Sequence, residues 1–94
     1  MIPDIILEHI ARERCRQDEK WGEQNHCPLF WLAIIGEEYG ESCKAEIEGK
    51  RRVLRVELTH VAASAIAAIE SLDRGGLVTE EAIKILDRNK ENHE

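Results

Sequence analysis

The sequence is poor in residues that interrupt helices: its 94 residues include only two prolines and six glycines. No stretch of any length shows the alternation of apolar and polar residues that is typical of strands. Apolar residues recur instead at steps of three and four, which is the spacing of one helix face. The sequence therefore predicts an all-α protein, and its length fits a single small domain over residues 1–94.

Two further absences limit the classes of function. No apolar run is long enough to span a membrane, and 34% of the residues are charged, so we expect a soluble protein with no membrane partner. The chain also lacks an excess of positive charge, since its formal net charge is −6. A protein that coats a nucleic acid polymer needs a basic face to displace the counterions of the phosphates. The charge therefore argues against a polymer of nucleic acid as the partner.

The three cysteines are Cys15, Cys27 and Cys43, an odd number with no Cys-x-x-Cys spacing. The first residues of the chain do not follow the pattern of a signal peptide. We therefore expect reduced thiols and a cytoplasmic protein.

Four helices are expected, over residues 3–20, 28–48 and 52–74, and in a short segment that starts near Thr79. Pro28 suits the first turn of the second helix, and Gly49 suits a turn after it. The second and third helices should therefore form a hairpin, with Gly75 ending the third.

Apolar periodicity predicts which side of each hairpin helix faces the core. In the second helix the expected core stripe is Leu29, Leu32, Ala33, Gly36, Tyr39 or Gly40, Cys43 and Ile47. In the third helix it is Leu58, Val61, Ala62, Ala65, Ile66, Ile69 and Leu72. Further alanines make the third helix small-sided nearly all round, which predicts a partner subunit packed against it. Gly36 and Gly40 weaken a helix interior, so a helix or a ligand should approach them closely.

Acidic side chains form two pairs at helical spacing. Glu38 and Glu41 share one face of the second helix, and Glu57 and His60 share one face of the third. In the hairpin, Glu38 comes level with His60, and Glu41 comes level with Glu57. Carboxylates that close raise one another's pKa unless a cation lies between them, and Mg²⁺ prefers such oxygen ligands. Two interpretations of His60 remain open: a helix-to-helix hydrogen bond to Glu38, or a ligand that would suit Mn²⁺ or Zn²⁺ better than Mg²⁺.

A segment between the first two helices carries Trp21, Asn25 and His26, and Trp31 follows it. One interpretation is structural: Trp21 closes the end of the bundle and His26 caps the next helix. The other is a base-binding pocket, in which an indole stacks on a nucleobase and Asn25 or His26 addresses the base edge.

The run Gly36-Glu37-Glu38-Tyr39-Gly40-Glu41, followed by Glu57-Leu58-Thr59-His60, resembles the Glu-Glu-x-x-Glu and Glu-x-x-Asp signature of MazG-like all-α nucleoside triphosphate pyrophosphohydrolases. The segment Lys20-Trp21-Gly22 with Asn25-His26, and the alanine-rich run after Glu57, resemble small phage and mobile-element members of that superfamily. Related dCTP pyrophosphatases place a Trp and a His in the base pocket. The likeness covers residues 17–74.

The resemblance implies a four-helix-bundle-like fold completed by dimerisation, as a homodimer or a tetramer. It implies hydrolysis of a (deoxy)nucleoside triphosphate to the monophosphate and pyrophosphate, as housekeeping of the nucleotide pool. Glu38, Glu41 and Glu57 would be Mg²⁺ ligands, with Glu37 as a neighbouring ligand or the group that orients the attacking water. Lys20 and Lys44 are candidates for contact with the phosphates.

His60 stands where the family has Asp. This departure leaves a second hypothesis, in which the chain is a nucleotide-binding or dimerisation module that keeps the fold and has lost turnover. A helical interaction protein without a ligand is a third, weaker alternative.

Overall fold

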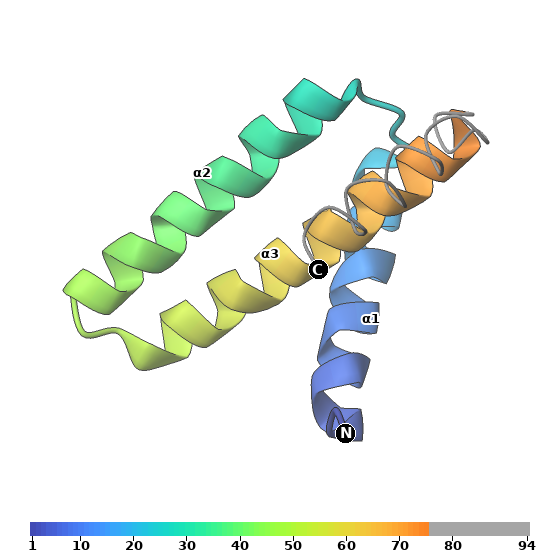
Figure 1. The fold of residues 1–94 in the computed structure, drawn as a ribbon. Helices are drawn as coiled ribbons and strands as arrows, with labels where there is room; N and C mark the ends of the chain where they lie inside the picture. The colour runs from blue at the N-terminus through green and yellow to red at the C-terminus, as the bar shows by residue number, and fades with distance from the viewer. Residues whose placement is uncertain (76–94) are drawn as a thin grey trace, which may run out of the picture.

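Three helices form the part of the chain that the computed structural model describes, residues 1–75 (Figure 1). They are α1 (Asp4–Trp21), α2 (Pro28–Ile47) and α3 (Arg51–Arg74). These bounds confirm the first three predicted helices to within a residue or two. The short helix predicted from Thr79 lies outside the described residues.

The turns follow from local chemistry. Pro28 is the first residue of α2, where its missing N–H costs nothing. Gly49, in the turn between α2 and α3, has a φ of 70°, and Gly22, at the end of α1, has a φ of 69°. Glycine adopts this left-handed region without the steric cost that a Cβ would impose. The two glycines thus fix where α1 ends and where the hairpin turns.

The central element is α3, because α1 and α2 both pack on it and not on each other. Figure 1 shows α2 running antiparallel to α3, with α1 crossing α3. The buried side of α3 consists of small residues, which let two helices approach closely: Ala63, Ser64, Ala67, Ala68 and Ser71. Trp31 of α2 is only 4% exposed and packs in the core with Ala67 and Ala68.

The predicted core stripe of α2 is wrong. All of its members are exposed, and the side that faces α3 carries Trp31, Ile34, Ile35, Ser42 and Ala45 instead. The reason is that α2 is apolar on two opposite sides, and periodicity alone cannot tell which side meets α3. In α3, three members of the predicted stripe are likewise exposed, namely Leu58, Ile66 and Ile69.

The expected close neighbour of Gly36 and Gly40 is also missing from the described chain. A Cβ placed on either glycine would meet nothing within 4 Å. Each glycine costs a helix interior about 1 kcal/mol relative to alanine. Packing between residues 1–75 of one chain therefore does not explain them.

The all-helical fold class is confirmed. Within the described residues, none of the helices combines the length and the apolar character that a membrane span requires.

The packing on α3 yields a stability prediction. Ala63 is fully buried, so Ala63→Leu should overpack the small-residue side of α3 and cost about 1–3 kcal/mol in the free energy of unfolding. Ala11→Leu, the same change on the exposed side of α1, should stay within about 0.5 kcal/mol of the wild type. Urea denaturation followed by circular dichroism measures both; equal stability of the two variants would contradict the packing.

Candidate active site

A cavity of about 690 Å³ opens between α1 and α2. It exists because both helices pack on α3 without touching each other, so α3 forms its floor. Its lining side chains come from all three helices and the α1–α2 loop: Glu13, Arg16, Gln17, Lys20, Trp21, Gln24, His26, Phe30, Trp31, Ile34, Glu37, Glu38, Glu41, His60 and Ser64.

The polar end of the cavity gathers acids from three helices around one histidine. His60 Nε2 lies 3.7 Å from Oε1 of Glu13 on α1, and His60 Nδ1 lies 3.5 Å from Oε2 of Glu57 on α3. These side chains are mostly buried, with 10% of Glu13, 15% of Glu57 and 27% of His60 exposed. The imidazole therefore separates two carboxylates that would otherwise repel each other.

Glu38 joins this cluster from α2. Ser64 Oγ donates a hydrogen bond of 2.5 Å to Glu38 Oε1, and Gln17 Nε2 donates one of 3.4 Å to Ser64 Oγ. Burial raises the pKa of Glu38, and the negative charges of Glu57 and Glu13 add to this, against the opposing effects of Ser64 and His60. The site thus holds a carboxyl whose ionised form is disfavoured in the absence of a cation.

Glu13 is a site residue that the sequence interpretation missed. Arg16 donates two hydrogen bonds to it, at 2.8 and 2.6 Å, and this pairing lowers the pKa of Glu13 although burial opposes the shift. Residues 12–20 are almost wholly polar, a pattern that fits either a solvated face or a polar site. The four-residue spacing of Glu13 and Gln17 was the available signal, since it places both on one side of α1.

The donor chemistry at this end suits a hard divalent cation. Three carboxylates face one region, and Oε2 of Glu57 is buried with no hydrogen-bond partner. As the side chains of residues 1–75 stand, however, no three His, Cys, Asp or Glu residues are grouped so that they could hold a metal ion. A cation would have to displace His60 from its contacts with Glu13 and Glu57.

The other end of the cavity is aromatic. The ring of His26 lies 4.5 Å from that of Phe30 and 5.0 Å from that of Trp31, measured between centroids. Trp21 is half exposed, with Lys20 Nζ 4.6 Å from its ring centroid and the guanidinium of Arg16 at 5.7 Å. This end therefore offers aromatic faces next to two cations.

The structure brings most of the predicted site residues to this cavity. Those that line it are Lys20, Trp21, His26, Trp31, Glu37, Glu38, Glu41 and His60, and Glu57 adjoins it through His60. Asn25 and Lys44 do not line it. Asn25 instead accepts a hydrogen bond of 3.0 Å from Arg74 and donates one of 3.0 Å to Glu23. Lys44 is exposed near the end of α2.

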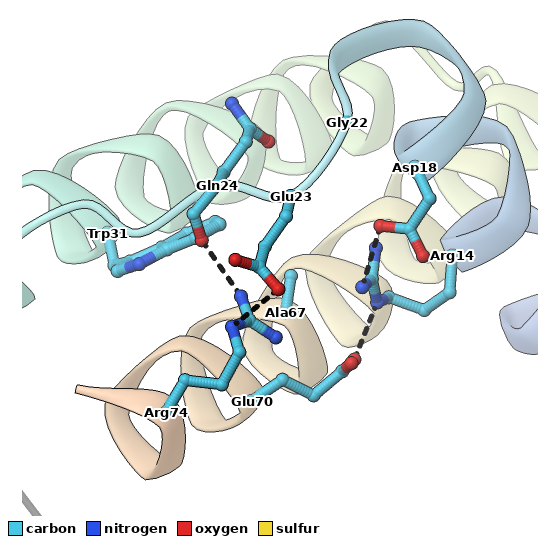
Figure 2. A pocket seen from close by; sticks show the side chains of 9 residues that line it. All are labelled: Arg14, Asp18, Gly22, Glu23, Gln24, Trp31, Ala67, Glu70 and Arg74. Carbon is cyan, nitrogen blue, oxygen red and sulfur yellow. Dashed lines mark hydrogen bonds and ion pairs between the residues drawn. The ribbon is translucent and has the colours of Figure 1, made fainter. Parts of the chain in front are cut away.

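A second cavity, of about 280 Å³, lies beside Trp31, which lines both cavities (Figure 2). Its two arginines are already paired, as the dashed lines in Figure 2 show. Arg14 binds Glu70 and Asp18 at 3.0 and 3.1 Å, and Arg74 lies 3.3 Å from Glu23. Carboxylates thus pair with both cations of this cavity, and the larger cavity is the stronger candidate for an active site because it gathers the predicted acidic and aromatic residues.

Comparisons with protein-family models, curated proteins and solved structures give no match for this chain.

The environment of Glu38 predicts how stability depends on pH. Because the folded chain raises the pKa of this carboxyl, native stability falls as the pH rises from about 4 through the folded pKa. Glu38→Gln keeps an acceptor for Ser64 but carries no charge. In metal-free buffer the variant should therefore unfold at a higher temperature than the wild type at pH 7, with the difference shrinking towards pH 4.

Thermal unfolding at several pH values measures this effect. Glu37→Gln makes the same chemical change at the neighbouring exposed position and serves as the control. If the unfolding temperatures of the wild type and Glu38→Gln differ by the same amount at pH 4 and at pH 7, Glu38 does not carry a buried, destabilised charge.

Proposed function

We propose that this protein is a metal-dependent pyrophosphohydrolase of (deoxy)nucleoside triphosphates, of the MazG-like type. The observation that supports it best is that one cavity joins the glutamates of the first motif and His60 of the second to the aromatic residues in and beside the α1–α2 loop. A nucleotide has the same two parts, a charged triphosphate and a flat base. The motif resemblance adds to this geometry, and the proposal depends on both.

At the acidic end, Glu38, Glu41 and Glu57 would hold Mg²⁺, or Mn²⁺ in its place. Bound there, the cation would neutralise phosphate charge and lower the pKa of a water molecule. Glu37 and Glu41 are exposed on the cavity wall, where they can reach a ligand without a change of the backbone. Glu37 would orient the attacking water towards the α-phosphorus.

At the other end, Trp21 and His26 would contact the base, because an aromatic face stacks on any nucleobase. Trp31 is almost fully buried and closes the cavity rather than stacking freely. Lys20 and Arg16 lie beside Trp21, and Arg16 also pairs with Glu13 of the acidic end. Both cations would contact the phosphates. Trimming of the nucleotide pool is the role that this activity would serve.

We further propose that the chain works as a homodimer, since large apolar side chains of α2 and α3 stay exposed in a single chain. Residues such as these mark interaction surfaces when they lie together.

The activity itself can be tested by product analysis. Incubation with Mg²⁺ or Mn²⁺ and each common nucleoside triphosphate should give monophosphate and pyrophosphate, separated by ion exchange. Glu41→Gln should reduce the rate by about a hundredfold or more, because cation-held charge contributes several kcal/mol to such reactions. Glu46→Gln, the same change on α2 outside the cavity, should leave the rate unchanged. Release of inorganic phosphate instead of pyrophosphate would contradict attack at the α-phosphorus.

A second candidate function is nucleotide binding without turnover. The position of His60 favours it, because this residue replaces the family Asp and contacts the carboxylates of Glu13 and Glu57.

Restoring the acid distinguishes the two functions. If the native chain is a binder, His60→Asp should create turnover where the wild type has none, since it removes the imidazole and adds a carboxylate. If the wild type already hydrolyses triphosphates, the variant should instead change the preference between Mg²⁺ and Mn²⁺. Steady-state rates with both metals measure this, and titration calorimetry with each triphosphate records binding independently of turnover.

A further inference from the structure

Four polar side chains are linked by hydrogen bonds from the smaller cavity to the polar end of the larger one. Arg14 Nη1 donates to Gln17 Oε1 at 3.0 Å, and Gln17 Nε2 donates to Ser64 Oγ at 3.4 Å. Ser64 Oγ in turn donates to Glu38 Oε1 at 2.5 Å. We name this series the Arg14–Glu38 chain. Its two middle members are buried, with 8% of Gln17 and 4% of Ser64 exposed, so water competes little for their hydrogen bonds.

The direction of every bond in the Arg14–Glu38 chain follows from Arg14. A guanidinium donates hydrogen bonds and cannot accept them, so Gln17 must turn its carbonyl oxygen towards Arg14 and its NH2 group towards Ser64. The Ser64 oxygen accepts from that NH2 group, and its single proton is left for Glu38. If Gln17 were reversed, its oxygen would face Ser64 and compete with Glu38 for the same proton. Arg14 thus determines which way the Ser64 hydroxyl points.

Arg14 can orient Gln17 because its guanidinium is itself held in place. Nε donates to Glu70 and Nη2 donates to Asp18, at 3.0 and 3.1 Å, which leaves Nη1 for Gln17. Figure 2 shows Arg14 with these two carboxylates beside the smaller cavity. Only 14% of the Arg14 side chain is exposed. The ion pair with Glu70 would suffice to attach α1 to α3, so the additional bond to Gln17 points to a second role.

The last bond of the Arg14–Glu38 chain acts on Glu38. A carboxylate with one oxygen bonded to a buried hydroxyl does not rotate freely, so Glu38 keeps one orientation where it lines the larger cavity. Outer partners of this kind orient the ligating side chains of metal sites. We infer that Arg14 is a positioning residue for Glu38 and that it acts through Gln17 and Ser64. Only the identity of what Glu38 binds rests on the proposed function.

The Arg14–Glu38 chain is tested on the full chain, without metal or nucleotide, by nuclear magnetic resonance. The signals to follow are those of the Gln17 side-chain amide and of the Glu38 carboxyl carbon. Arg14→Met removes the donor that orients Gln17. Both signals should therefore shift, and the amide signals should broaden because the amide then takes both orientations. Arg14→Lys keeps a group that only donates and should retain the wild-type signals.

Two matched controls separate this role from simple attachment of α1. Arg12→Met removes the same charge from an exposed position of α1. Glu70→Gln removes the charge that attaches Arg14 to α3 but keeps an acceptor. Both variants should leave the signals of Gln17 and Glu38 in place. Signals that also stay in place in Arg14→Met, or that move equally in Glu70→Gln, would overturn the inference.

A second variant covers the case in which circular dichroism shows that Arg14→Met does not fold. Gln17→Met has a similar length but cannot donate to Ser64, so it breaks the Arg14–Glu38 chain at its next member. The carboxyl carbon signal of Glu38 should shift in this variant too. An unchanged Glu38 signal in a folded Gln17→Met would equally refute the positioning role.

Metal affinity tests the consequence that rests on the proposed function. Binding of Mn²⁺ without nucleotide is followed by electron paramagnetic resonance. Ser64→Ala and Arg14→Met should each weaken it by about 10–100-fold, the range typical of outer partners of metal ligands. Because both residues act on Glu38 through the same bonds, the double variant should lose little more than Ser64→Ala alone. Losses that add in the double variant would show that Arg14 acts independently of Ser64, against the inference.

The two tests fail separately. A wild type that binds no Mn²⁺ would refute the metal-dependent activity proposed above. The Arg14–Glu38 chain would still be decided by the resonance signals of Gln17 and Glu38, which are recorded without metal.

Discussion

The small side chains of α3 are the constraint on which the described structure depends. Ala63, Ala67 and Ala68 let both α1 and α2 pack closely on one helix. Because α1 and α2 then do not pack on each other, the larger cavity remains between them with α3 as its floor. A larger residue on that side of α3 would push a helix away and change the fold and the cavity together. The same small residues of α3 therefore determine both the packing of the core and the shape of the cavity.

Burying carboxylates at the polar end of the larger cavity has an electrostatic cost. Glu38 is half-buried near Glu57 and Glu13, and its pKa is raised accordingly. His60 and Ser64 offset part of that cost through their contacts with the acids. A carboxyl whose pKa is raised by burial, beside specific charged partners in a cavity, is a candidate functional residue, and Glu38 meets this description. A cation that replaces His60 between the carboxylates would remove the same cost.

The two apolar sides of α2 have different consequences. The side with Trp31 and Ala45 builds the core of one chain, and the opposite side, with Leu29, Leu32 and Ile47, stays exposed. A small domain gains little from a single core, so the homodimer proposed above would supplement its stability.

The sequence alone determined the helices, because proline, glycine and apolar spacing act locally: α1, α2 and α3 begin and end close to the predicted residues. It also singled out Glu38, Glu57 and His60, since helical spacing and a hairpin turn at Gly49 suffice to bring them near one another. It could not decide which apolar side of α2 is buried, because both sides satisfy the same period and only the fit of Trp31 against Ala67 and Ala68 distinguishes them. Nor could it assign Glu13 to the site, since that depends on how α1 crosses α3, a long-range contact that no local pattern encodes. Local chemistry thus set the elements, and tertiary packing decided which faces meet.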